Sequence, residues 1–210
     1  MDHAQYVRRY ISECAKEAGN PDNPPFIKHF FEKFGAGIEE RVASASKGDR
    51  NIIATPFSDA LKHIFPGVVP QARFGSIFNL SGEGATEKNF KNKSVDFKID
   101  GAAATLLIEF KSTLTFNDVS AAIVEMALAK KFAAKYNFGM RLSTASLHLY
   151  PSADIRMINE VNSMMGAPLD RIWVLCKKPR ASVPYEFYFD IGKIIMMMED
   201  IDLLLGQIGE

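Results

Sequence analysis

The fold is decided by two neighbouring stretches of sequence, Ser94-Val95-Asp96-Phe97-Lys98-Ile99 and Thr105-Leu106-Leu107-Ile108-Glu109-Phe110-Lys111. Both stretches are rich in the β-branched and aromatic residues that are typical of strands. The dipeptide Asp100-Gly101, a strong turn signal, lies between them. The sequence therefore predicts two consecutive antiparallel strands, at residues 93–99 and 105–113.

The register of this hairpin decides whether two acidic side chains lie together. A loop over residues 100–105 places Asp96 opposite Glu109, and residues directly opposite share one side of a sheet. A tight turn at Asp100-Gly101 instead places Asp96 opposite Thr105, which leaves Glu109 about 13 Å along the strand. We expect the wider loop.

The second strand carries two charged residues within an apolar run. Because side chains alternate along a strand, Glu109 and Lys111 point to one face, while Leu106, Ile108 and Phe110 point to the other. A buried charge is costly unless it is paired or holds a metal ion. One face of this strand should therefore pack in the core, and the other can do chemistry.

The two acids and the lysine suggest a metal site. Mg²⁺ prefers oxygen ligands and keeps several waters, so one or two carboxylates are a sufficient contribution from the protein. Asp96 and Glu109 supply them, and the backbone carbonyl of Phe110 can add another oxygen. Lys111 would orient a water or help to deprotonate it, and would stabilise charge growing at phosphorus. This set, with Mn²⁺ as a substitute for Mg²⁺, can hydrolyse a phosphodiester.

The rest of the chain supplies helices and strands around the hairpin. Apolar residues recur at helical spacing over residues 25–46, and residues 119–137 follow a good capping cluster. The further predicted elements are helices at residues 54–65, 152–165 and 191–205, strands at residues 146–150, 171–176 and 186–190, and one strand or two over residues 68–74 and 76–80. This order predicts an α/β fold with a mixed central sheet flanked by helices.

The chain fits one domain, because its 210 residues include 47% apolar residues and 16 Phe. We expect a core at about residues 26–176, an N-terminal arm with a short helix at residues 1–25, and a C-terminal strand and helix at residues 177–210. The last helix is apolar on much of its circumference. It is either buried or a surface for a homodimer, and the sequence leaves both open.

Composition limits the partners and the compartment. The 25 basic and 25 acidic residues give no global attraction to nucleic acid or to a membrane, so any attraction must come from local patches. Cys14 and Cys176 fit neither a disulfide framework nor a zinc site. The first residues hold no apolar signal core, and no stretch approaches the ~20 apolar residues of a membrane span. We expect an intracellular protein, cytoplasmic or in the nucleoid or nucleus, that is neither secreted nor membrane-spanning.

Asp96, followed on the next strand by Glu109-Phe110-Lys111, resembles the signature of the PD-(D/E)XK nuclease superfamily, which includes restriction endonucleases, repair nucleases and resolvases. The resemblance covers most of the chain but rests on three residues. It implies a restriction-endonuclease-like core in the order αβββαβ, with Asp96, Glu109 and Lys111 as the catalytic residues. Val95 stands where the family often has proline, at a position that varies widely.

The resemblance also implies a role for the first core helix. In many members a glutamate from this helix reaches the metal ion. Glu39 lies at the border of the apolar stripe of the predicted helix, so it is the candidate, with Glu32 as a competitor.

Phosphate binding needs positive charge close to the metal ion. Several lysines surround Asp96 in sequence, and Lys98 shares its strand face with Asp96. On the helix after the second strand, Glu125 and Lys130 or Lys131 could face the site. The candidate nucleic-acid contacts are Lys91, Lys93, Lys98 and Lys130.

The leading hypothesis is a Mg²⁺-dependent nuclease, with DNA favoured over RNA and an endonucleolytic mode. A nonenzymatic module on a nuclease-like fold, binding nucleic acid or protein, is the main alternative. An RNA endonuclease of the viral cap-snatching type is a third reading, and it would need His29 or His63 in the site. The four histidines have no zinc-site spacing, and the phosphate loop GxxxxGK[ST] and the hydrolase elbow GxSxG are absent from the sequence.

Overall fold

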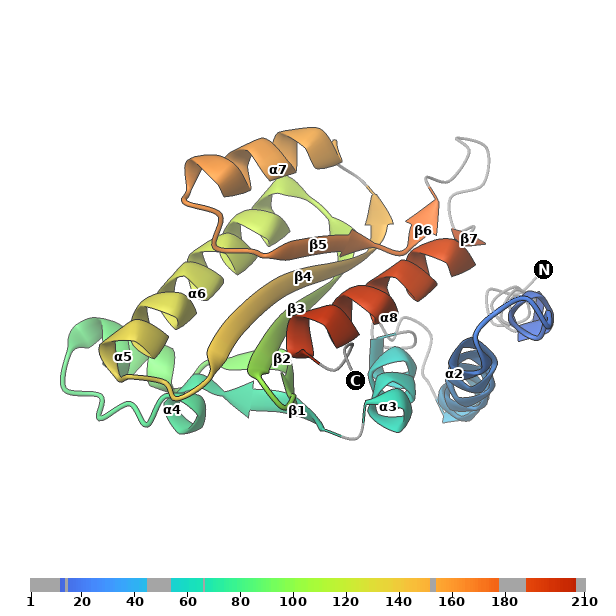
Figure 1. Ribbon diagram of the computed structural model, residues 1–210, viewed down its shortest axis with the longest axis horizontal. Helices are drawn as coiled ribbons and strands as arrows, with labels where there is room; N and C mark the ends of the chain where they lie inside the picture. Colours follow the sequence, from blue (N-terminus) through green and yellow to red (C-terminus); the bar gives the residue numbers. More distant parts are fainter. Residues whose placement is uncertain are drawn as a thin grey trace.

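A computed structural model of the protein describes residues 12–13, 15–44, 54–65, 67–151, 154–177 and 188–206. Its centre is an open five-stranded sheet in the order β1-β2-β3-β4-β5 (Figure 1). The strands are β1 (Val68–Arg73), β2 (Ser94–Asp100), β3 (Ala104–Leu114), β4 (Arg141–Pro151) and β5 (Arg171–Val174). The first three strands pair antiparallel, and β3, β4 and β5 pair parallel. The predicted α/β fold with a mixed sheet is confirmed.

Helices cover both faces of the sheet (Figure 1). On one face lie α2 (Pro25–Ser44), α3 (Ala54–Ile64) and α8 (Ile191–Leu205). On the other lie α4 (Phe74–Ile77), α5 (Ala85–Lys91), α6 (Phe116–Lys135) and α7 (Ile155–Met164). A separate small sheet pairs β6 (Cys176–Lys177) with β7 (Tyr188–Phe189).

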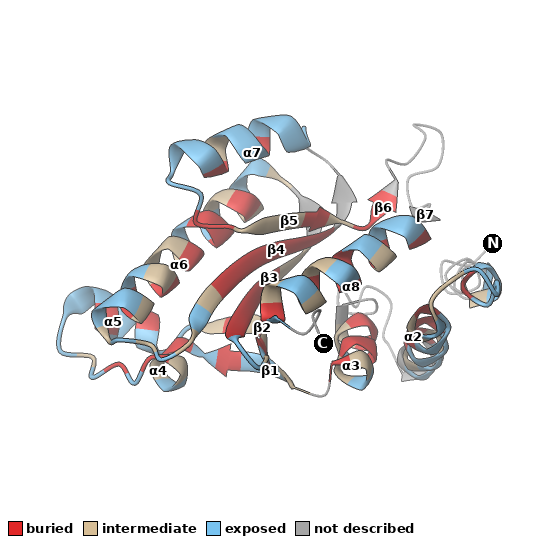
Figure 2. Ribbon diagram, in the orientation of Figure 1, coloured by how far each residue is buried: buried red, intermediate tan, exposed pale blue. Residues whose placement is uncertain are grey.

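Each face of the sheet carries its own apolar core, and β3 contributes to both. Leu106 and Ile108 pack with the phenylalanines of α2 and α3, whereas Leu107 packs with α6. The alternation expected for this strand is therefore confirmed. As a result of this packing on both faces, β3 and β4 are buried along much of their length, while the outer sides of the helices are exposed (Figure 2).

Local capping signals fix the helix that follows β3. The side chain of Thr115 accepts a hydrogen bond from the backbone N–H of Asp118 at 3.1 Å, which satisfies one of the free donors of the first turn of α6. At the far end of the chain, α8 stops at Gly206, whose φ of 72° is the left-handed conformation that glycine adopts without strain. These helices were predictable because residues close in sequence determine where α6 begins and where α8 ends.

Two short helices between β1 and β2 were not predicted. The strand expected at residues 76–80 is wrong, because residues 74–77 form α4. Phe74 and Phe78 are four residues apart, so one helical turn places both rings on the same side, where Phe74 stacks on Phe90 of α5 at a ring distance of 4.1 Å. The predicted elements likewise include none at residues 85–91, which form α5.

The C-terminal helix packs within the same chain. Six apolar residues of α8 are buried, while Met196 and Leu203 are exposed on its outer side. Burial in the core accounts for most of its apolar surface, and a homodimer through α8 stays a prediction. Cys176 is buried, and Cys14 lies outside the described residues. None of the described helices combines the length and apolarity that a bilayer crossing requires.

Candidate active site

The hairpin of β2 and β3 has the register that brings the two acids together. Asp100 pairs with Thr105 and Phe97 pairs with Ile108, so the wider loop is confirmed. One residue further along this register, Asp96 comes opposite Glu109. Both acids therefore lie at the same end of the hairpin.

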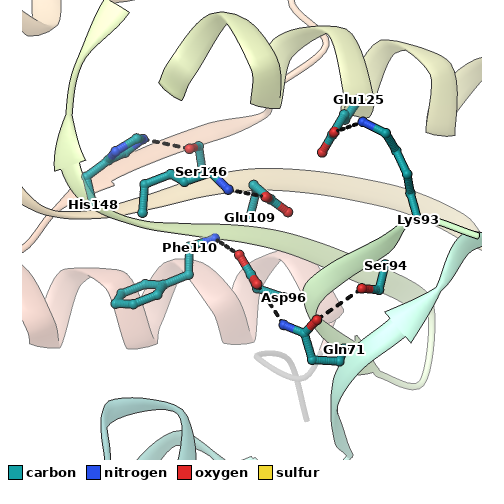
Figure 3. Close-up of polar contacts among 10 residues, drawn as sticks. Gln71, Lys93, Ser94, Asp96, Glu109, Phe110, Glu125, Ser146 and His148 are labelled. Carbon is teal, nitrogen blue, oxygen red and sulfur yellow. Dashed lines mark hydrogen bonds and ion pairs between the residues drawn. The ribbon is translucent and has the colours of Figure 1, made fainter. Parts of the chain in front are cut away.

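The strands separate where the site begins. Phe97–Ile108 is the last backbone pair of this ladder in the described part of the chain. Beyond it, the Asp96 carboxylate takes the place of a backbone acceptor, since its Oδ2 accepts the N–H of Phe110 at 2.8 Å (Figure 3). In an antiparallel ladder the N–H and C=O of one residue point to the same neighbouring strand. The same geometry would direct the carbonyl of Phe110 towards β2, and its role as a ligand stays a prediction.

Gln71 of β1 holds the other oxygen of Asp96. Its Nε2 donates to Asp96 Oδ1 at 2.8 Å, and its Oε1 accepts from Ser94 Oγ at 3.0 Å (Figure 3). The backbone of Gln71 has a φ of 50°, which is uncommon for a residue other than glycine, and such conformations cluster at functional sites. Sequence reasoning missed Gln71, because nothing local to it signals a contact with a residue 25 positions away.

Glu109 is the buried acid of the site. It is 6% exposed; its Oε1 accepts from Lys111 Nζ at 2.5 Å, and its Oε2 is buried without a hydrogen-bond partner among the described residues. Burial, and next the charge of Asp96, raise the pKa of Glu109 to about 7, against the opposing effect of Lys111. An unpartnered buried oxygen is unfavourable, and a proton or a cation would satisfy it.

Lys111 is a cation at neutral pH. Burial lowers its pKa, but the hydrogen bond to Glu109 and the charges of Glu109, Asp96 and Glu125 outweigh burial, so that the pKa of Lys111 lies above its ordinary value. A lysine that keeps its proton donates hydrogen bonds and offsets negative charge. Of the two roles expected for it, orienting a water is the one that this environment favours.

A second ion pair borders the site from the helix side. Lys93, which precedes β2, pairs with Glu125 of α6 (Figure 3). The charge of Glu125 acts on both Glu109 and Lys111. Glu125 and Lys93 were both candidates from the sequence, and the structure brings them to the same place.

The other lysine candidates are placed differently. Lys98 pairs with Asp100 on β2, and Lys91 of α5 donates to the carbonyl of Ser81 at 3.2 Å. Lys130 pairs with Asp170 at 2.9 Å, next to the start of β5. Their contacts with nucleic acid stay predictions.

The candidate residues on α2 and α3 lie on the face of the sheet opposite to α6. Glu39 is exposed on α2, which covers the face of the sheet away from α6, and its role as a metal ligand stays a prediction. Its competitor Glu32 is also exposed, and its Oε1 lies 3.9 Å from Lys28 Nζ. His29 and His63 are exposed and contact each other edge to face, with 6.3 Å between ring centroids.

A buried polar pair on β4 adjoins the site. Ser146 is in register with Glu109 and His148 with Lys111, and Ser146 Oγ lies 2.6 Å from His148 Nε2 (Figure 3). Paired residues of neighbouring strands share a face, so the polar strip of β3 continues onto β4. His148, one of the four histidines without zinc-site spacing, is completely buried.

The residues present fit a small Mg²⁺ site. Among the described residues, no three His, Cys, Asp or Glu side chains are close enough together to hold a metal ion. Two carboxylates, one carbonyl and several waters form a smaller set that Mg²⁺ accepts. The buried, unpartnered Oε2 of Glu109 supports this set, because a divalent cation there would satisfy it and offset the neighbouring carboxylates.

We expect Gln71→Leu to weaken the binding of a divalent cation about 10- to 100-fold, the usual cost of losing a residue that orients a metal ligand. The variant removes both side-chain hydrogen bonds of Gln71 and leaves the Phe110 N–H as the partner of Asp96. Titration with Mn²⁺ measures the affinity. Ser94→Ala is the matched control, since it removes only the bond to Gln71 and should cost less; equal affinities of Gln71→Leu and the parent would show that Gln71 does not position Asp96.

Comparison of this chain with models of protein families, with curated proteins and with solved structures finds no significant match. The chemistry of the site therefore rests on the geometry of Asp96, Glu109 and Lys111 and on the residues that hold them.

Proposed function

We propose that this protein is a metal-dependent nuclease that hydrolyses phosphodiester bonds, with DNA as the favoured substrate and an endonucleolytic mode. One observation carries the proposal. Asp96 and the buried Glu109, whose Oε2 has no partner among the described residues, meet beside the Lys111 cation where β2 and β3 separate. With α3, α4 and α5 taken as additions, the order of α2, β1, β2, β3, α6 and β4 also supports it, because it agrees with the αβββαβ order that the PD-(D/E)XK resemblance implies.

Each residue of the site has a distinct part in this proposal. Asp96, Glu109 and the carbonyl of Phe110 would hold Mg²⁺, which supplies Lewis-acid activation of water and phosphate when bound. Gln71 and the Phe110 N–H fix the Asp96 carboxylate. Lys111 donates hydrogen bonds to the attacking water and offsets the charge that grows on the phosphoryl oxygens.

The ion pair of Lys93 and Glu125 gives the site a cation that a substrate can reach. The Lys93 side chain is 53% exposed, whereas that of Glu125 is 18% exposed. An incoming phosphate could therefore contact the Lys93 ammonium from the solvent side while Glu125 stays behind it. This contact would position the nucleic-acid backbone without reading its sequence.

The second candidate function is a nonenzymatic module that binds nucleic acid or protein. The observation in its favour is that the described residues hold no cluster of three metal-ligating side chains. The balanced charge of the chain agrees with a role that does not require a large basic surface. A site that binds no divalent cation would distinguish this module from a nuclease.

The test of the proposed function is incubation with supercoiled double-stranded DNA, circular single-stranded DNA and RNA, each with Mg²⁺ or with EDTA. We expect nicking or linearisation of a closed circle with Mg²⁺ and intact circles with EDTA. Cutting of a closed circle establishes an endonuclease, because an exonuclease needs an end. If all three substrates stay intact with Mg²⁺, and also when Mn²⁺ replaces Mg²⁺, the proposal is overturned and the nonenzymatic module is favoured.

A further inference from the structure

A groove opens beside the candidate active site. It has a volume of about 690 Å³ and is lined by β1, β2, α4 and the segment that connects α6 to β4. This volume is within the range of about 300–1,000 Å³ of ligand sites in proteins. Gln71 lines the groove and also donates a hydrogen bond to Asp96, so the groove lies next to the residue that holds this carboxylate.

The groove carries positive charge on one side. Arg73 is exposed, and it makes no ion pair with any residue that the structure describes. Lys98 and Asp100 line the same groove and pair with each other, so Arg73 supplies the cation of this lining that no carboxylate offsets among the described residues. Arginine without a carboxylate partner, in a groove that shares Gln71 with the proposed nuclease site, is suited to a phosphate group.

The floor of the groove is apolar and includes an aromatic ring. Ile77, Phe138 and Met140 line it, and each is only partly buried. Phe138 contacts Phe78 edge to face, with 5.6 Å between ring centroids, which holds its ring in place. Partly exposed aromatic rings beside basic side chains are the elements that bind unpaired bases, by stacking, together with their phosphates.

We infer that this groove holds one unpaired nucleotide next to the scissile phosphodiester, with its base on Phe138 and its phosphate on Arg73. The inference rests on the proposed function and narrows the substrate to single-stranded nucleic acid or a duplex with an unpaired end. A base inside a continuous duplex is stacked and paired, so it cannot enter the groove without being flipped out.

Two substitutions test the inference through binding. The probes are a fluorescein-labelled single-stranded DNA of about 15 nucleotides and the blunt duplex of the same sequence. Anisotropy is measured with Ca²⁺ in place of Mg²⁺. We expect Phe138→Leu to weaken single-strand binding about tenfold, with little effect on the duplex. Arg73→Gln should weaken single-strand binding about fivefold and reduce the slope of log K against log[salt] by about 0.7.

Arg156→Gln is the matched control, because it makes the same change at an exposed arginine of α7 whose partner is Asp154. It should bind the single strand within about twofold of the parent. Circular dichroism checks that Phe138→Leu folds, and the exposed Arg73 gives a variant that does not disturb the core. The inference is overturned if both groove variants bind the single strand as tightly as the parent does. It is also overturned if the parent binds the duplex and the single strand equally well.

The outcomes also separate this inference from the proposed function. If the parent cuts nucleic acid with Mg²⁺ and both groove variants bind and cut like the parent, the groove assignment is wrong and the nuclease assignment stands. If the parent cuts none of the substrates, the nuclease assignment fails, and the groove assignment fails with it.

Discussion

Asp96→Asn should reduce Mg²⁺-dependent cleavage of nucleic acid by about a thousandfold or more. The asparagine keeps an oxygen that can accept the Phe110 N–H, so the junction of β2 and β3 stays intact. It removes the negative charge that a divalent cation requires at this position. The rate of nicking of circular single-stranded DNA with Mg²⁺ measures the loss.

The control for this variant is Asp59→Asn, which makes the same change at an exposed aspartate of α3 that pairs with Lys62. It should nick at the parental rate. Thermal unfolding of Asp96→Asn should remain within a few degrees of the parent, since no core residue changes. A folded Asp96→Asn protein that nicks as fast as the parent would remove Asp96 from the site.

The second large effect concerns Glu109 and the stability of the metal-free protein. Burial and the charge of Asp96 raise its pKa from 4.5 to about 7, so the folded state binds this proton more tightly than the unfolded state. Stability is therefore lost as pH rises from 4.5 through 7, up to a ceiling of about 3 kcal/mol. Glu109→Gln has no such titration, and its stability should change less over the same range.

Urea unfolding in EDTA at pH 5 and pH 8 measures this difference. The stability of Glu109→Gln relative to the parent should increase between the two pH values, and excess Mn²⁺ at pH 8 should stabilise only the parent. Glu199→Gln, an exposed acid of α8, is the control and should follow the parent. Parallel stability curves for the parent and Glu109→Gln would show that Glu109 ionises normally.

The parts of the site that could be predicted from sequence are local. The alternation around Glu109 and the turn signal at Asp100-Gly101 each involve a few neighbouring residues, and they predicted the hairpin and left two registers, of which the structure has the one that places Asp96 opposite Glu109. The start of α6 was predictable for the same reason, since Thr115 and Asp118 cap it locally. The wider loop was expected without a local signal that excludes the tight turn, and the pairing of Asp100 with Thr105 confirms it.

The parts that could not be predicted depend on contacts between distant segments. Gln71 joins the site through an uncommon backbone conformation on an edge strand, which no residue pattern signals. The raised pKa of Glu109 depends on how deeply the packed helices bury it. Apolar and polar residues alternate over residues 74–80 in a way that also suits a strand. The stacking of Phe74 on Phe90 of α5, a contact between distant residues, favours the helix instead.

The measurement that bears most directly on the site is calorimetric titration of the protein with Mn²⁺ near neutral pH. The geometry of Asp96, the Phe110 carbonyl and the unpartnered Glu109 Oε2 predicts saturable binding heat, absent from Asp96→Asn and Glu109→Gln. Absence of heat in the folded parent, or the same heat in both variants, would contradict a metal site between β2 and β3.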